Sequence, residues 1–161
     1  MDVLKAKGNL LEYASGLNHK YELSKTVSDD YYEPGMMENL EQYWGVYDDS
    51  AKTLVLRLES KGLRYENRTK NLEKLAVGDE IQIIREETNP YNSNNFMIQN
   101  HNDSLGNLPA DLCNVLAPLY DAGYAVIQAA TVSYLEKIKE RSRYAKQGVL
   151  FVELQIKLRG I

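Results

Sequence analysis

Apolar residues in the middle of the chain recur at every second position, and this period of two commits the chain to a largely β fold. Leu54, Leu56 and Leu58 follow the period, and residues 43–47 have the aromatic and β-branched composition of a strand. Residues 48–52, which lie between these two runs, are mostly small and polar, as in a turn. Because alternation is typical of a strand with one buried face, the two runs predict a β-hairpin.

The later part of the chain mixes further strands with two helices. Strands are expected at 80–85, 96–99, about 124–135 and 148–158, and a short helix is expected at 69–75. A longer helix is expected to begin near Pro109, which suits a first helical turn, and to end at Gly123. Because these helices do not alternate regularly with the strands, the order argues against a parallel doubly wound sheet. It favours a small, mostly antiparallel barrel or sandwich.

The first 50 residues differ from the rest in charge and are harder to interpret. They carry a net charge of −6, whereas residues 51–161 carry +2, which gives −4 for the chain. Apolar residues between 10 and 23 show weak helical spacing that Gly16 interrupts, and residues 29–35 have the composition of a turn. We expect residues 1–50 to be an acidic, Tyr-rich extension that packs on or over a barrel formed by residues 51–161.

Several function classes are excluded or disfavoured by composition. No apolar run is long enough to span a membrane, and the N-terminus lacks the apolar core of a signal peptide, which predicts a cytoplasmic protein. Cys113 is the single cysteine, so no intrachain disulfide forms, and with only His19 and His101 beside it there is no zinc-site spacing. No phosphate loop, nucleophile elbow or Cys/His pairing is present, so we expect no catalysis and no cofactor. Cys113 itself is expected to be a buried, inert thiol.

The connection at residues 85–96 stands out among the turns. Its centre, Asn89-Pro90-Tyr91-Asn92, has turn chemistry, because Asn side chains bond nearby backbone and tolerate positive φ. A tyrosine is unusual in such a place and is expected at the loop tip with its ring exposed. The segment is therefore either a plain hairpin connection or a binding loop held by a rigid scaffold.

Five short motifs follow one another between residues 62 and 123. They are Gly62-Leu63-Arg64-Tyr65 with Asn67-Arg68, Leu75-Ala76-Val77-Gly78-Asp79, Arg85-Glu86 with Asn89-Pro90-Tyr91, Leu105-Gly106-Asn107-Leu108-Pro109, and Leu116-Ala117-Pro118-Leu119 with Gly123. In this order they resemble the motifs of the HIRAN domain, a module of helicase-like replication-fork remodellers that also occurs as a small stand-alone bacterial protein. The resemblance covers roughly residues 53–158. It implies a small OB-like antiparallel β-barrel of six strands with two helices.

The resemblance also implies a function. Helicase-associated members of the family bind single-stranded DNA at its 3′ end, with an aromatic platform for the terminal base and a polar pocket for the terminal hydroxyl. This chain is accordingly expected to be a non-catalytic module for single-stranded or frayed 3′ DNA ends. One base stacked on a Tyr ring contributes roughly 1–3 kcal/mol.

The family motifs assign roles to individual residues of this chain. Tyr65 and Tyr91 match the aromatic positions that would stack on the base. The other residues implied are Arg64 and Arg68 for phosphates, Asn89 and Asn92 for the end pocket, Asn107 beside it, and Lys137, Lys139, Arg141 and Arg143 as peripheral phosphate contacts.

The chain departs from the family pattern at the centre of this pocket. The family motif continues Asn-Pro-Tyr-Asp-x-Asn-Ala-Ile, whereas this chain reads Asn89-Pro90-Tyr91-Asn92-Ser93-Asn94-Asn95-Phe96. Asn92 thus replaces a carboxylate that would accept a bond from a terminal hydroxyl, and Asn107 replaces an aromatic or His ring. Because a charged acceptor roughly doubles such a bond, we expect weaker discrimination between a 3′ hydroxyl and a 3′ phosphate.

Each of these residues also has a structural interpretation, and the alternatives remain open at this stage. Tyr65 and Tyr91 can pack on the core, Arg64 and Arg68 can pair with Glu66 or Glu73, and Arg85 can tie the barrel to the helix. The strip 136–146, with a net charge of +3, can be a solvated hairpin. The alternative function is a protein-interaction or scaffold module that has lost DNA binding, with the acidic N-terminal segment docked on a basic partner or masking the DNA face.

Overall fold

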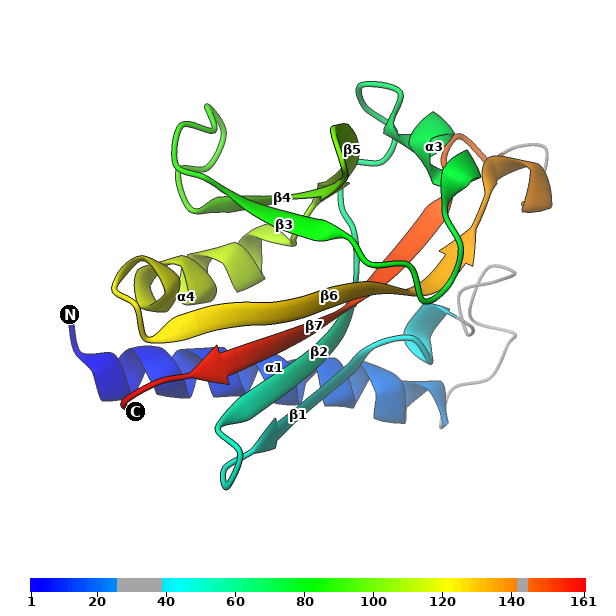
Figure 1. Ribbon diagram of the computed structural model, residues 1–161. Helices are drawn as coiled ribbons and strands as arrows, with labels where there is room; N and C mark the ends of the chain where they lie inside the picture. The colour runs from blue at the N-terminus through cyan, green and yellow to red at the C-terminus, as the bar shows by residue number, and fades with distance from the viewer. Residues whose placement is uncertain (26–38, 142–144) are drawn as a thin grey trace.

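Two antiparallel sheets make up most of the structure, a computed structural model that describes residues 1–25, 39–141 and 145–161 (Figure 1). One sheet has four strands in the order β1 (Trp44–Asp48), β2 (Thr53–Glu59), β7 (Val149–Leu158) and β6 (Ala125–Glu136). The other has three strands in the order β3 (Gln82–Glu86), β4 (Asn95–Asn100) and β5 (Asp103–Asn107). The predicted hairpin at 43–58 and the predicted strands near 80, 96, 125 and 149 are confirmed.

Helices cover one side of the larger sheet and one end of the molecule. They are α1 (Val3–Ser24), the short α3 (Arg68–Asn71) continued by the 3₁₀ turn η2 (Leu72–Lys74), α4 (Ala110–Asp121), and a second 3₁₀ turn η3 (Ile138–Glu140). The two predicted helices correspond to α3 with η2 and to α4, but the expected count of two is wrong because α1 is also present.

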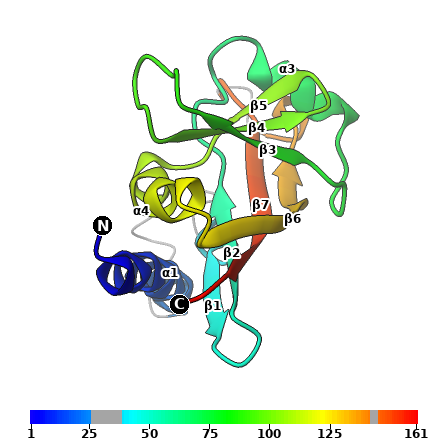
Figure 2. The ribbon, with the colours of Figure 1, turned by 60° about the vertical axis from the view of Figure 1, so that its left-hand side comes forward.

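The 22-residue helix α1 is continuous through Gly16. Asp2 caps its first turn by accepting a hydrogen bond from the Lys5 N–H at 3.1 Å. Leu10, Ala14 and Leu17, at helical spacing, are almost fully buried and face β1 and α4. In Figures 1 and 2, α1 lies at the side of the molecule away from the loops that connect β3 to β4 and β2 to α3. The predicted turn at 29–35, with Tyr31 and Tyr32, lies outside the described residues.

A close approach of α1 to β1 joins the N-terminal helix to the sheet. A Cβ at Gly45 would overlap the Ala14 carbonyl oxygen and lie 2.9 Å from its carbon, so only glycine fits there. The Asn18 side chain accepts from the Gly45 N–H at 2.9 Å, and its amide donates to the Gly45 carbonyl. Among the described strands β1 is the outermost of its sheet, so Asn18 pairs backbone groups that no other described strand reaches.

The main core lies between the larger sheet, α1 and α4. The alternating residues that predicted the strands supply it, since Leu54, Leu56 and Leu58 of β2 are fully buried. Phe151 of β7 is also fully buried, with the Tyr43 and Tyr134 rings packed edge-on against it at 5.0 and 5.9 Å. The buried period of two thus fixes which face of each strand points inward.

The prediction of a closed six-stranded barrel was wrong. The described strands number seven and form two separate sheets, which touch through two isolated bridges, Lys61 with Asn107 and Glu80 with Thr131. The ladders stop at these points because the chain leaves strand geometry. Gly62 and Gly78, which lie next to the bridges, have positive φ values of 81° and 94°. The fold is therefore mostly β, with two antiparallel sheets that do not close. No helix among the described residues is long and apolar enough to cross a membrane.

Candidate functional site

Tyr91 stands at the tip of the loop between β3 and β4. The Asn89 side-chain oxygen accepts hydrogen bonds from the backbone N–H groups of Tyr91 and Asn92, at 2.9 and 3.0 Å. This Asx turn fixes the backbone and points the Tyr91 ring outward, where it is 96% exposed. The Tyr91 ring could therefore contact a ligand without leaving a packed position in the fold. The interpretation of Tyr91 as a core residue is excluded.

Arg85 anchors the base of this loop. Its guanidinium forms two bonds to the Asp121 carboxylate of α4, at 3.0 and 2.9 Å, and also donates to the Ser93 carbonyl at 2.7 Å. The pKa of Arg85 is raised, chiefly by the hydrogen bond to Asp121. The structural interpretation of Arg85, as the tie between a sheet and the helix, is confirmed.

Asn92 is bound on both sides of its carboxamide. Its oxygen accepts from the Asn94 N–H at 3.0 Å, and its amide nitrogen donates to Asn114 of α4 at 3.2 Å. Asn94 donates to the same Asn114 oxygen at 3.3 Å. Asn114 was not anticipated from the sequence, because its contact with the loop spans 22 residues and depends on how α4 packs.

Tyr65 occupies the second loop, which leads from β2 to α3. Its ring is 55% exposed, so it is neither a core residue nor fully free. The Arg64 guanidinium lies over the ring, 5.0 Å from its centroid, and donates to the Tyr65 hydroxyl at 2.8 Å. Arg64 therefore holds the ring in place and keeps its own charge at the surface.

Arg68 is buried rather than available at the surface. It is 9% exposed, donates to the Gly62 carbonyl at 3.2 Å and pairs with Glu66 at 3.1 Å. Its Nε has no partner among the described residues. Of the two interpretations of Arg68, a phosphate contact or an ion pair within the protein, the structure has the ion pair, with Glu66. Through its bond to Gly62, Arg68 also stabilises the loop that carries Tyr65.

A buried hydrogen-bond network links the two loops. The Asn95 amide, 6% exposed, donates to Glu86 at 2.6 Å and to the Asn107 side-chain oxygen at 3.0 Å. Asn107 in turn exchanges two backbone hydrogen bonds with Lys61, both 2.9 Å, next to the Tyr65 loop. Sequence reasoning missed Asn95 and Glu86 as members of this site. One feature of the sequence could have indicated Asn95, because a polar residue stands at a position where the family motif has Ala.

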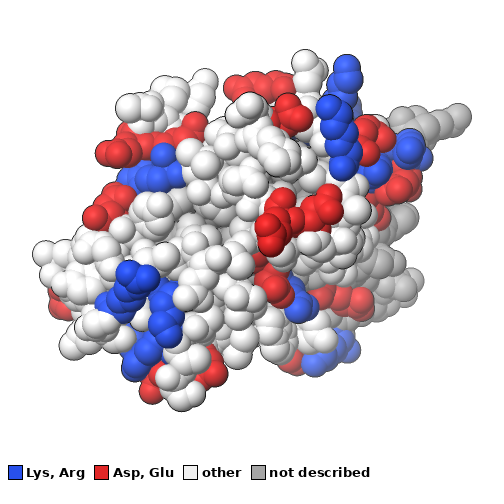
Figure 3. Space-filling model, viewed as in Figure 1, with Lys and Arg blue, Asp and Glu red and all other residues white. Residues whose placement is uncertain are grey.

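The basic strip after β6 is engaged with neighbouring groups. Lys137 donates to the Glu73 carbonyl at 2.9 Å, and Lys139 pairs with the Glu73 carboxylate at 3.7 Å. Arg141 pairs with Glu136 at 3.7 Å, while Arg143 lies outside the described residues. On the face shown in Figure 3, Lys and Arg are interspersed with Asp and Glu, and the described residues there form no continuous basic stripe. A phosphate track along this strip has no support beyond the charges themselves.

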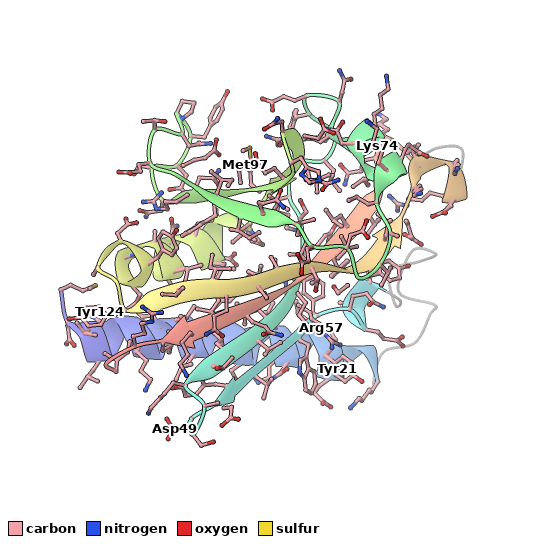
Figure 4. All side chains as sticks on the ribbon, viewed as in Figure 1. Tyr21, Asp49, Arg57, Lys74, Met97 and Tyr124 are labelled. Carbon is pink, nitrogen blue, oxygen red and sulfur yellow. The ribbon has the colours of Figure 1, made fainter. Side chains whose placement is uncertain are left out.

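Other features of the molecule lie away from the two loops. A cavity of about 260 Å³ opens on the outer face of the larger sheet beside Arg57. Arg57, which is labelled in Figure 4, is paired with Glu153 at 2.9 Å. In the described part of the chain, no group of three His, Cys, Asp or Glu side chains is placed to hold a metal ion. Cys113 is buried, as predicted, and burial raises the pKa of its thiol to about 11, which disfavours the reactive thiolate.

Comparison with known proteins identifies the architecture around these loops. The family model of the HIRAN domain matches residues 54–150, more than half of the chain. The chain belongs to the HIRAN domain family. HIRAN domains are known in general as binding modules for the 3′ ends of DNA, and are generally non-catalytic. The HIRAN match includes both tyrosine loops and leaves α1 and β1 outside it.

Two solved structures resemble the chain at low identity. The crystal structure of the HIRAN domain of human HLTF is 23% identical, with 64% of this chain and 76% of that one covered and a TM-score of 0.46. A protein from Lactobacillus plantarum is 21% identical, with 64% and 97% covered and a TM-score of 0.47. No curated protein matches the sequence.

Proposed function

We propose that this HIRAN domain is a non-catalytic module that binds single-stranded or frayed 3′ ends of DNA. The observation that carries the proposal is the pair of exposed rings, Tyr65 and Tyr91, on two loops joined by the Asn95 network. In this proposal one or both rings stack on terminal bases, and stacking needs no sequence readout.

The charged groups of the site have unequal parts in the proposed binding. Arg64 is exposed, and its guanidinium can contact a phosphate without leaving the Tyr65 ring. Arg68 is neutralised by Glu66 and supports the loop instead. Asn89 and Asn92 shape the end pocket through the turn that they form. Phosphate contacts from this strip would require the hydrogen bond of Lys137 to the Glu73 carbonyl and the ion pairs of Lys139 and Arg141 to open.

A fluorescence polarisation titration with a short labelled single strand at low salt tests the proposal. The Tyr65→Ala/Tyr91→Ala double variant is expected to bind roughly 10- to 100-fold more weakly, from a stacking contribution of about 1–3 kcal/mol per base. The matched Tyr65→Phe/Tyr91→Phe variant keeps both rings and is expected to bind as the parent does. Because both rings are at the surface, neither pair of substitutions should prevent folding, which thermal unfolding verifies.

The end preference is tested with the same strand closed into a circle. A circular strand has no terminus, so it should bind much more weakly than the linear one. A duplex with a 3′ single-stranded overhang should in turn bind better than one with a 5′ overhang. Equal binding of linear and circular strands would refute end recognition while leaving single-strand binding in place.

A second candidate is a protein-interaction role without DNA binding. The mixed charge of the site favours it, because Glu66 pairs with Arg68, and Glu86 and Glu87 flank the Tyr91 loop. Absence of binding to any strand at low salt would select this candidate. Helix α1 of the N-terminal segment is not placed to mask the loops, since it packs against β1 and α4 on the other side of the molecule (Figures 1 and 2).

A further inference from the structure

Three carboxamides meet between the Tyr91 loop and helix α4. Asn92 and Asn94 of the loop both donate their side-chain amides to the Asn114 oxygen, at 3.2 and 3.3 Å. Asn92 and Asn94 are half-buried and Asn114 is exposed, so the group can be reached from solvent. We call these three residues the amide cluster.

The orientation of the amide cluster follows from the backbone. The Asn92 oxygen is fixed by the Asn94 N–H at 3.0 Å, so its NH₂ must face Asn114. Asn114 must then turn its oxygen toward the loop and its NH₂ toward solvent. The neighbouring Asn89 oxygen is already occupied by two backbone N–H groups.

The spare hydrogen-bonding capacity of the amide cluster is therefore mostly that of a donor. Each NH₂ has two hydrogens, and Asn92 and Asn94 each use one of them within the cluster. Both hydrogens of the Asn114 NH₂ are unused among the described residues. A ligand group that matches this pattern is rich in acceptors, as a phosphate is, whereas a hydroxyl also needs an acceptor for its proton.

The charges around the amide cluster do not exclude an anion. Arg85 and Asp121 neutralise each other in a two-bond pair, while Glu86, bonded to Asn95, and the exposed Glu87 keep their charges at the start of the loop. No carboxylate among the described residues is hydrogen-bonded to the amide cluster itself. Asp111, one turn before Asn114 in α4, is the nearest acidic residue along the helix, and it is exposed. A carboxylate at position 92 would place a negative charge within the amide cluster, whereas the Asn92 carboxamide is neutral.

We propose that the amide cluster accepts the phosphate group of a DNA strand that ends in a 3′ phosphate, so that this chain binds such strands at least as well as 3′-hydroxyl strands. The inference rests on the proposed binding of 3′ ends and specifies which chemical ends are taken. It assigns Asn94 and Asn114 to the site in addition to Asn92.

The test compares two strands of one sequence, one ending in a 3′ hydroxyl and the other in a 3′ phosphate, each labelled at its 5′ end. The parent protein is expected to bind the phosphate strand with an affinity equal to or higher than that for the hydroxyl strand. Asn92→Asp should weaken binding of the phosphate strand about tenfold, the effect of one like charge about 4 Å away near a solvated surface. Asn92→Asp should fold, because a carboxylate oxygen also accepts the Asn94 N–H.

Two further variants separate the amide cluster from general charge effects. Asn102→Asp adds the same charge at an exposed position in the β4–β5 turn, at the other end of the hairpin, and should leave the ratio of the two affinities unchanged. Asn114→Ala removes the donor at an exposed helical position and should weaken the phosphate strand severalfold more than the hydroxyl strand. Equal weakening of both strands would contradict a phosphate contact.

The outcomes distinguish the two proposals. Binding confined to the 3′-hydroxyl strand, or a measurably higher affinity for it than for the phosphate strand, overturns the phosphate inference and leaves 3′-end binding intact. Absence of binding to either strand overturns both.

Discussion

Asn18 provides the sharpest test of whether the N-terminal helix belongs to the folded unit. The Asn18→Ala substitution removes the carboxamide that pairs with both backbone groups of Gly45 in β1. Gly45 is buried beneath α1, so water cannot easily replace the lost partners. The helix backbone itself is unaffected, because alanine is the best helix former.

The size of the effect can be worked out from these contacts. A net hydrogen bond contributes about 1 kcal/mol, and a buried group left without a partner costs about 1–3 kcal/mol. Loss of both bonds to Gly45 is therefore expected to cost about 2–4 kcal/mol. The better helix propensity of alanine returns about 0.5 kcal/mol, which leaves a net loss of roughly 2–3 kcal/mol in the free energy of unfolding.

Urea unfolding of the full chain measures this loss, with Asn9→Ala as the matched control. Asn9 lies in the same helix and is exposed, and its side chain has no hydrogen-bond partner among the described residues. Its substitution should raise stability by about 0.5 kcal/mol through helix propensity alone. The midpoint for Asn18→Ala should fall with little change in slope. Equal midpoints for the two variants would show that α1 does not pair with β1 in solution, and our expectation that residues 1–50 pack on the sheets would fail with it.

Three other predictions concern stability. Gly45→Ala should cost more than about 2 kcal/mol, because its Cβ would overlap the Ala14 backbone, and a thermal scan that shows no change would contradict this packing. Arg85→Met should cost about 2–4 kcal/mol, whereas Asp121→Asn, which retains one acceptor, should cost less in the same urea assay. Burial raises the pKa of Cys113 from 9.0 to about 11, so the unfolded chain loses this proton first. The free energy of unfolding should decline between about pH 9 and pH 11, and Cys113→Ala should decline less steeply over that range.

The strands could be predicted because burial on one face leaves a period of two in the sequence. This signal is local, so β2 and β7 were predicted nearly to the residue. β5 was missed because Asp103-Ser-Leu-Gly-Asn107 has little β propensity. It is a strand for a non-local reason. Gly106, at φ 109°, leaves no side chain where the backbone of Lys61 and the side chain of Ser60 approach it.

α1 was underestimated for a related reason. Two of its core contacts involve small residues, Ala14 on the helix and Gly45 on the strand, which do not stand out in a hydrophobic pattern. Their value comes from how closely the two backbones approach, and Asn18 then reaches Gly45 across 27 residues of sequence. Sequence periodicity carries no information about either contact. The failure to close the barrel is similar, since it depends on where two sheets meet rather than on any single strand.

In the candidate site, turn chemistry was readable and side-chain pairing was not. Asn89-Pro90-Tyr91 predicted an exposed ring, and the structure has one. Arg68 looked equivalent to Arg64 in sequence, yet one is buried against Glu66 and the other lies over Tyr65. The difference arises because Asn67 adopts a left-handed conformation, with φ 61°, and turns the chain into α3 with Arg68 facing inward.

The departures from the family motif are best understood in pairs. Asn95 stands where the motif has Ala, Asn107 stands where it has a ring, and these two side chains are bonded to each other at 3.0 Å. A polar group introduced alone at the buried position 95 would be costly, whereas with Asn107 and Glu86 as partners its amide is satisfied. Asn92 likewise comes with a partner, Asn114. The fold can therefore accept all three changes with its hydrogen bonds intact. In the proposed site, a carboxylate and one ring of the family motif are replaced by carboxamides, while the Tyr65 and Tyr91 rings remain exposed. The same fold is therefore compatible with a different preference for the chemical group at the 3′ end of DNA.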